Sequence, residues 1–376
     1  MSDTRMHVLH VYKDVHPTIV GGIERHIDDL RRGLPDVRSD VLVCSRRLRT
    51  TQFRTRYGIE VQVGELGRIL SAPIAPCFPM ILRRRQAALL HVHMPNPTGE
   101  ASALLARRDI PLVASHHADI VRQLALRPLY TPLANRLFRR ASAIVVGAHA
   151  TARQSELLAP HTEKVRVIPY GVDTDRFDVA RADPDRVAAI RDELGSPIVA
   201  ATGRLVYYKG FELLIEAARD LDVSVVIIGG GPLEGALREL AAPYPRITIT
   251  GQVTEQRLVD LLAASDCFAL PSTSRAESFG IATVEAQAMG LPAIVTDVGT
   301  GTIEAIDPGR TGIVIAPGDV TGLRAAVEQL LGDDEQRARM SAAARERARA
   351  SLSLEVMAER FRRLYAEVLG EEQHGP

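Results

Sequence analysis

The stretch Glu277-Ser-Phe-Gly-Ile-Ala-Thr-Val-Glu285-Ala-Gln-Ala-Met-Gly-Leu-Pro292 places two carboxylates eight positions apart around an expected helix start. It follows the apolar run 267–270 and the chain breaker Pro271, so the local order is strand, loop, helix. A helix beginning near Gly280 directs unpaired N–H groups and the positive end of its dipole at an anion beyond the strand. Since a carboxylate accepts two hydroxyl hydrogen bonds, the segment predicts a site for a sugar nucleotide. The alternative is that both glutamates are solvated surface residues.

Length and composition indicate a soluble globular protein of two domains. The chain has 376 residues, of which 46% are hydrophobic and 24% charged. It contains no apolar run of about 18 residues and no N-terminal signal core, so we expect a cytoplasmic protein. Cys44, Cys77 and Cys267 have no metal-ligand spacing, and we expect buried free thiols.

Charge is distributed unevenly along the chain. Residues 1–180 hold 26 Lys and Arg against 17 Asp and Glu, a balance of +9, and the remaining 20 and 29 leave −9 for residues 181–376. The basic half predicts an anionic partner, either a lipid-linked or otherwise anionic acceptor or the inner face of a membrane, to which the protein would attach peripherally. Solvated helix edges are the alternative. Nucleic acid is not expected as a partner, since aromatic residues make up only 4% and no reader motif occurs.

Short β-rich runs alternate with helical patterns throughout, which is typical of parallel α/β units. This rhythm predicts two doubly wound domains joined near residues 169–178, with ligands at the carboxyl ends of the strands. The expected strands are residues 7–11, 39–44, 89–93, 111–115, 143–146, 165–168, 198–202, 224–228, 247–250, 267–270, 293–296 and 312–315.

Two cations follow the first expected strand of the second domain. Arg204 and Lys209 are on the loop after Thr202-Gly203, and Lys209 is one of only three lysines. Two fixed cations stabilise the negative charge that develops on a departing nucleoside diphosphate, without a metal. The alternative is that they are ordinary surface cations.

The segment Ser115-His116-His117-Ala118-Asp119 closes an expected strand in the first domain. A histidine there can share a proton with an acceptor hydroxyl or bind a sugar hydroxyl, and Asp119 can orient it. His91 and His93 share a strand face but have no third ligand at fixed spacing, so no metal site is predicted. Asp173-Thr-Asp175 is interpreted as a structural turn in the hinge.

Seven ordered pieces of the chain are similar to the retaining GT-B glycosyltransferases of family four, also called glycosyltransferase group 1. The similarity covers nearly the whole sequence. The pieces are residues 21–24, 91–97, 117–123 and 167–173, Gly203-Arg204 with Lys209-Gly210, residues 250–253, and the two-glutamate segment 277–285.

The resemblance implies a GT-B fold of two facing Rossmann-like domains with an interdomain cleft. It implies an acceptor domain in residues 1–171, a nucleotide-sugar domain in 172–353, and a terminal helix in 354–376 that crosses back to the first domain. It also implies that Arg204 and Lys209 hold the diphosphate, and that His117 faces the donor sugar and the acceptor. The remaining implied contacts are Glu277 for the donor sugar, Glu285 for the ribose, Gln252 and Val253 for the base, the segment Ser278, Phe279, Gly280 and Ile281 with Gly203 for sugar and phosphates, and Gly22 for phosphate or acceptor.

The activity implied by the resemblance is retaining, metal-independent transfer of a hexose to a hydroxyl acceptor, with no cofactor beyond the nucleotide sugar. The pieces 117–123 and 127–130 resemble bacterial mannosyl- and hexosyltransferases of polysaccharide and glycolipid assembly, which points to GDP-mannose. Ala118 stands where those relatives have serine, so a UDP-hexose or UDP-N-acetylhexosamine stays open. A GT-B sugar-nucleotide epimerase and a non-catalytic subunit of a polysaccharide-assembly complex are further alternatives.

Overall fold

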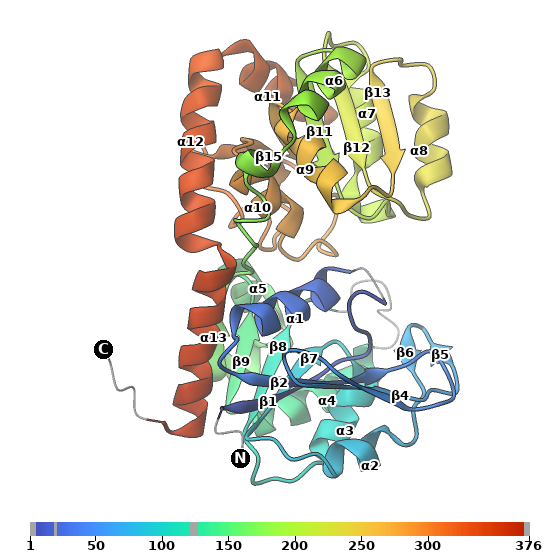
Figure 1. Ribbon diagram of the computed structural model, residues 1–376, viewed down its shortest axis with the longest axis vertical. Helices are drawn as coiled ribbons and strands as arrows, with labels where there is room; N and C mark the ends of the chain where they lie inside the picture. Colours follow the sequence, from blue (N-terminus) through green and yellow to red (C-terminus); the bar gives the residue numbers. More distant parts are fainter. Residues whose placement is uncertain (1–4, 19–20, 120–126, 372–376) are drawn as a thin grey trace. The chain divides into compact units, whose positions relative to one another are not determined.

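The computed structural model describes residues 5–18, 21–119 and 127–371 (Figure 1). The chain divides into two compact units, Met1–Tyr170 with Leu354–Pro376, and Gly171–Ser353. The first boundary falls one residue before the predicted one, and the segment from residue 354 belongs to the first unit. Both units are Rossmann-like α/β domains, as the alternating pattern predicted.

The first unit contains an eight-stranded sheet in the order β10-β9-β8-β7-β1-β2-β4-β3. Every described pair in it is parallel except β3 with β4. The strands are β1 His7–Val11, β2 Arg38–Cys44, β3 Thr51–Arg54, β4 Ile59–Val63, β7 Leu89–Met94, β8 Leu112–His116, β9 Ala143–Val146 and β10 Val165–Val167, with a separate hairpin of β5 Arg68–Ile69 and β6 Ala72–Pro73. The helices are α1 Gly22–Gly33, α2 Phe78–Arg83, α3 Pro97–Leu104, α4 Arg127–Arg140, α5 His149–Gln154 and α13 Leu354–Leu369.

Helices α1 and α13 lie side by side in this unit. Their buried side chains, including Leu30 and Phe361, form one apolar cluster with Leu34, which follows α1, and with Val8 and Val113 of the sheet. The last helix therefore completes the core of the unit that the beginning of the chain forms. Burial of each such side chain contributes roughly 1.5 to 3 kcal/mol relative to exposure.

The second unit is built on a six-stranded parallel sheet in the order β13-β12-β11-β14-β15-β16. The order reverses between β11 and β14, and ligands of doubly wound sheets bind at the carboxyl ends of the strands at such a point. The strands are β11 Ile198–Thr202, β12 Ser224–Ile228, β13 Ile247–Gly251, β14 Cys267–Leu270, β15 Ala293–Thr296 and β16 Gly312–Ile315. The helices are α6 Pro184–Leu194, α7 Phe211–Ala218, α8 Glu234–Ala241, α9 Glu255–Ala263, α10 Ile281–Ala288, α11 Val320–Gly332 and α12 Asp334–Ser351.

The structure tests the expected burial of the three cysteines. Cys44 and Cys267 are buried, but Cys77 is exposed, so the expectation of three buried thiols was wrong. Cys77 caps α2 at the surface, and the following Phe78 enters the core instead. In the part of the chain that the structure describes, no helix has the length and apolarity to cross a membrane.

Candidate active site

The switch point of the second sheet brings together two residues that are distant in sequence. Lys209 ends a short 3-10 turn after β11, and Glu277 is in the loop after β14. The Lys209 Nζ lies 2.6 Å from Glu277 Oε2, and both residues are buried. Burial lowers the pKa of Lys209, but the charge of Glu277 more than offsets it, with Tyr208 and Glu285 adding to the effect, so the pKa stays above its usual value.

Gly203 makes room for this ion pair. Its φ of +146° is one that side chains rarely adopt, and a Cβ there would lie 3.2 Å from both Cε and Nζ of Lys209. The neighbouring Arg204 is exposed, and no ion pair to it is found among the described residues. A neutralised Lys209–Glu277 pair beside an exposed guanidinium leaves the net positive charge on Arg204.

The start of α10 lies in the segment for which the sequence predicted amide donors to a ligand. Gly280 has a left-handed φ of +81° and precedes the first helical residue, Ile281. Its N–H donates to Glu277 Oε1 at 3.2 Å, so the same carboxylate holds the lysine and the helix start. Phe279 is buried, and Glu285 is buried one turn into the helix. This segment therefore presents an ordered helix start at the switch point.

Other predicted residues occupy different loops. Gln252 is exposed and Val253 half-buried in the loop after β13. Ser278 accepts the N–H of Gly301 at 2.8 Å through its carbonyl oxygen. Gly22 is the first residue of α1 in the first unit.

His117 lies in the first unit with both ring nitrogens hydrogen-bonded. Its Nε2 is 3.0 Å from Nδ1 of His93, and its Nδ1 is 2.7 Å from the Tyr170 hydroxyl. The ring is buried, and this burial lowers the pKa of His117 well below its usual range, with smaller contributions from His26 and His116. At neutral pH His117 is therefore uncharged and a weak base, which favours hydrogen bonding over proton abstraction.

Asp119 contacts the other histidine of the pair. Its Oδ1 lies 3.0 Å from His116 Nε2 and accepts the Ser155 hydroxyl at 2.7 Å. Asp119 thus orients His116, while His93 and Tyr170 orient His117. The reason is the strand geometry, because successive side chains point to opposite faces of the sheet. Residues 120–123 of the predicted motif lie outside the described residues.

The structure brings further histidines to His91 and His93 that sequence reasoning missed. Ring nitrogens lie within 4.8 Å of one another in two groups, His10 with His91 and His93, and His26 with His93 and His117. A partial signal was present in the sequence, since His10 lies within the expected strand 7–11, and the structure places it in register with His91 on β7. Strand order, which the sequence pattern does not provide, was needed to see it.

The candidate metal groups have few uncommitted nitrogens. His91 Nδ1 and Nε2 lie 2.7 Å from the hydroxyls of Tyr365 and Ser115. His93 uses both nitrogens toward His10 and His117. A metal would have to displace these contacts. The segment Asp173-Thr-Asp175 forms a turn, as predicted. Asp173 Oδ1 accepts the N–H groups of residues 175 and 176 at 3.1 and 3.0 Å.

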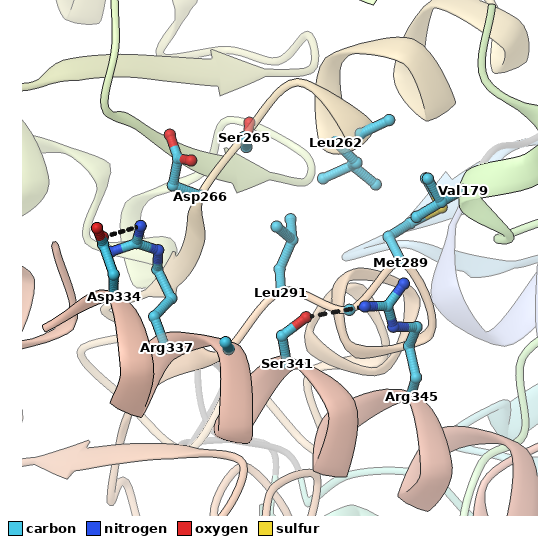
Figure 2. A pocket seen from close by; sticks show the side chains of 13 residues that line it. Val179, Leu262, Ser265, Asp266, Met289, Leu291, Asp334, Arg337, Ser341 and Arg345 are labelled. Carbon is cyan, nitrogen blue, oxygen red and sulfur yellow. Dashed lines mark hydrogen bonds and ion pairs between the residues drawn. The ribbon is translucent and has the colours of Figure 1, made fainter. Parts of the chain in front are cut away.

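A cavity of about 270 Å³ lies elsewhere in the second unit (Figure 2). The cavity is lined by Ser265 and Asp266, which precede β14, and by Leu291, which precedes β15. It therefore lies at the amino ends of these strands. Arg345 enters it from α12 and donates to Ser341. Because the predicted residues follow the carboxyl ends of the strands, this cavity is not the predicted site.

Comparison with known proteins gives matches along both units. Residues 186–347 match the family described as glycosyl transferases group 1, and residues 20–176 match glycosyltransferase family 4. The O-antigen chain mannosyltransferase C of Escherichia coli is 30% identical over 372 residues, covering 97% of this chain and 99% of the relative.

A second relative is similar over a shorter stretch. It is a GDP-mannose-dependent monoacylated alpha-(1-6)-phosphatidylinositol monomannoside mannosyltransferase of Corynebacterium glutamicum, 36% identical over 209 residues, or 52% of this chain and 54% of the relative. Among solved structures, the sucrose-phosphate synthase of Thermosynechococcus elongatus superposes with a TM-score of 0.80 at 18% identity, covering 98% and 100% of the two chains. This likeness confirms the predicted GT-B type of fold. Similarity that continues through both domains at this level means that the chain belongs to the group 1, family 4 glycosyltransferases and is a hexosyltransferase.

Proposed function

We propose that this enzyme is a metal-independent retaining glycosyltransferase that moves mannose from GDP-mannose to a hydroxyl acceptor. The observation that carries this proposal is the buried Lys209–Glu277 pair at the β11/β14 switch point, beside the exposed Arg204. The pair holds a carboxylate ready to accept sugar hydroxyls, and Arg204 supplies net positive charge for a diphosphate.

The residues of the second unit have separate roles in the proposed reaction. The bond between the sugar anomeric carbon and the diphosphate oxygen breaks, and the diphosphate leaves with the electron pair. Arg204 and Lys209 stabilise the leaving charge, with the amides at the start of α10 as further donors. The acceptor oxygen bonds to the same face of the sugar, and its proton passes to the leaving phosphate. Glu285 binds the ribose of the donor.

This route fits the state of His117. A buried imidazole with a strongly lowered pKa does not serve as the base that takes the acceptor proton at neutral pH. It serves instead as an uncharged hydrogen-bonding group toward the sugar, which is consistent with proton transfer to the leaving phosphate. The cations remove the need for a metal to neutralise the diphosphate.

The names of the two relatives support mannose and the guanine nucleotide. One is a mannosyltransferase of similar length, and the other is described as GDP-mannose-dependent. Ala118 follows His117 directly and carries no hydroxyl, so the donor panel below tests the sugar as well as the nucleotide base.

A surface of the first unit fits a lipid-linked acceptor held at an anionic membrane. Residues 46–85, which we call the basic-apolar segment, hold nine arginines against two glutamates. Within the segment Leu48, Leu66 and Ile69 are 77%, 68% and 64% exposed. Hydrogen bonds tie its parts together: Glu65 N–H to Arg47 carbonyl at 2.8 Å, and Arg85 to Gln52 at 3.0 Å. Exposed apolar side chains among arginines suit peripheral attachment to the inner face of a membrane.

The test of the proposed activity is sugar transfer from a panel of radiolabelled donors. The protein is incubated with GDP-mannose, UDP-glucose or UDP-N-acetylglucosamine and with lipids extracted from bacterial membranes. We expect label in the lipid fraction and free nucleotide from GDP-mannose alone, and an anomeric proton signal of the donor's configuration in the product. Transfer from a UDP-sugar would replace the proposed donor, and conversion of the donor to an isomer would favour an epimerase. A donor that stays intact in every mixture would favour a non-catalytic subunit.

A further inference from the structure

Four buried side chains of the first unit form a continuous hydrogen-bonded chain. His10 Nδ1 lies 3.1 Å from His93 Nε2, His93 Nδ1 lies 3.0 Å from His117 Nε2, and His117 Nδ1 lies 2.7 Å from the Tyr170 hydroxyl. The strands β1 and β7, which carry His10 and His93, flank the point where the strand order of the first sheet reverses. The chain therefore runs across the place where a doubly wound sheet receives its ligand.

The ring geometry is that of N–H···N hydrogen bonds between imidazoles. The ring centres of His93 and His117 are 5.3 Å apart and the planes differ by 7°. For His10 and His93 the values are 5.4 Å and 25°. Each centre separation exceeds its nitrogen separation by about two imidazole ring radii, so the bonded nitrogens lie near the line joining the centres. An N–H and a lone pair both point along that line, which is the favoured arrangement for a hydrogen bond. A metal bound by nitrogens of both rings would lie off the line that joins the ring centres.

The hydrogen-bonded chain allows two consistent sets of proton positions, one with every hydrogen pointing toward Tyr170 and one with every hydrogen pointing toward His10. A neutral imidazole has one donor and one acceptor nitrogen, so the proton position on one ring sets those of its neighbours. At the His10 end, Nε2 is buried and has no hydrogen-bond partner among the described residues. If the hydrogens point from His10 toward Tyr170, this atom is an unpaired acceptor. The reverse direction would make it a buried N–H without an acceptor, and orphaned N–H groups are the rarer case in native proteins.

We propose that His10 and His93 are positioning residues that hold His117 as the tautomer protonated on Nδ1. This inference rests on the proposed function, in which His117 meets the donor sugar. Both nitrogens of His117 are occupied, so a substrate must replace one of its partners. Exchange of Tyr170 for a substrate oxygen keeps the tautomer, because His93 continues to donate to Nε2. His117 thus offers the substrate one N–H in a preset direction.

The test is ¹⁵N NMR of the histidine-labelled full-length protein, with the His117 signals assigned from a His117→Gln spectrum. The wild type is expected to show Nδ1 protonated and Nε2 unprotonated. His93→Phe keeps an aromatic ring at this position but removes both hydrogen bonds. The His117 nitrogens of this variant are expected to show averaged shifts from both tautomers. The matched control is His91→Phe, on the same strand face and equally buried but hydrogen-bonded to Ser115 and Tyr365. It is expected to leave the His117 signals unchanged.

Kinetics provide the second readout. A preorganised hydrogen-bond donor contributes roughly a hundredfold or more to turnover, so losing the tautomer in His93→Phe should lower kcat at least tenfold with little change in KM. His91→Phe should keep kcat within about twofold of the wild type. Because NMR does not depend on turnover, an inactive protein with Nδ1 protonated would overturn the proposed activity and leave the assigned tautomer standing.

Three results would overturn the proposal. One is a wild-type His117 protonated on Nε2, which needs no variant and so holds even if His93→Phe fails to fold. Another is an equal loss of kcat in both variants. The last is about one equivalent of zinc, nickel or copper in the purified protein by elemental analysis, because a metal on these rings would take the nitrogens that the chain requires.

Discussion

The Lys209 ammonium, after β11, lies 2.6 Å from the Glu277 carboxylate, after β14, so one ion pair joins the two loops of the switch point. Glu277 also accepts the Gly280 N–H and thereby fixes the start of α10. The residues proposed for diphosphate, sugar and ribose are organised by this one contact. It is buried, and a buried pair is costly to break from one side.

Removing one partner of the pair should lower both stability and activity. Lys209→Met leaves a buried carboxylate uncompensated, and we expect the free energy of unfolding to fall by about 3 kcal/mol. Turnover of the donor should fall at least about a hundredfold, as for loss of a preorganised donor at a leaving group. Urea unfolding and nucleotide release measure the two effects.

The double variant Lys209→Met with Glu277→Gln is the control. It should regain most of the lost stability, because the uncompensated carboxylate of Glu277 is gone, and should stay inactive. If it were as active as the wild type, the pair would have a structural role only.

Gly203 should not tolerate a side chain. We expect Gly203→Ala to destabilise the protein by at least about 1 kcal/mol and to lower activity, because the new Cβ would meet Lys209 at a φ suited to glycine. Gly235→Ala in α8 is the matched control. Beyond its own stretch of chain, no atom lies within 4 Å of its added Cβ, and alanine favours the helix by about 0.5 to 1 kcal/mol. Thermal unfolding of both variants distinguishes them, and equal effects would contradict the close packing.

Stability should fall in acid through the buried histidines. Burial lowers the pKa of His26 from 6.5 to about 4. Below pH 6.5 the unfolded chain takes up a proton that the folded protein excludes, so the free energy of unfolding falls by up to about 1.4 kcal/mol per pH unit for this residue, until the pH nears 4. Glu100, whose pKa burial raises to about 7, acts in the opposite direction.

Comparison with His26→Phe isolates the contribution of one histidine. Between pH 6.5 and 5 the variant should gain about 1.6 kcal/mol relative to the wild type, because the unfolded histidine is already half protonated at pH 6.5. Denaturant unfolding at several pH values measures this gain. Parallel pH profiles would show that His26 is protonated equally in both states.

The basic-apolar segment should bind anionic membranes. Flotation with anionic liposomes is expected to carry the wild type upward, and neutral liposomes to carry less. Arg83→Glu with Arg84→Glu should weaken binding more than tenfold, since each basic residue near the surface contributes about 1 kcal/mol. The control, Arg246→Glu with Arg339→Glu, makes the same charge change on exposed residues of the second unit. Equal binding to both kinds of liposome would refute the electrostatic contact.

The sequence pattern predicted every parallel strand of both sheets except β4, because buried strands carry apolar β-branched runs. The exposed strand β3, Thr51–Arg54, was missed since its residues are mostly polar and solvated. β4, β5 and β6 were missed with it. β4, Ile59–Val63, alternates apolar and polar residues, so its strand signal was present in the sequence but was not used. β5 and β6 have two residues each, too few to show a period.

Site residues close in sequence were easier to predict than those joined by the fold. Glu277 and Gly280 belong to one motif, and their hydrogen bond follows from local geometry. The chain from His10 to Tyr170 joins residues up to 160 positions apart, and it depends on which strands are neighbours. Periodicity does not specify strand order, so this network became visible only in the structure.

The central claim is a guanine sugar-nucleotide site organised by Lys209 and Glu277, and its most direct test is thermal unfolding with GDP, UDP, ADP and dTDP, each free and sugar-bearing. A ligand at a hundred times its dissociation constant stabilises by roughly 2.7 kcal/mol. The account predicts a rise in Tm with GDP and GDP-mannose that is lost in Lys209→Met. The same rise in that variant, or no rise with any nucleotide, would contradict it.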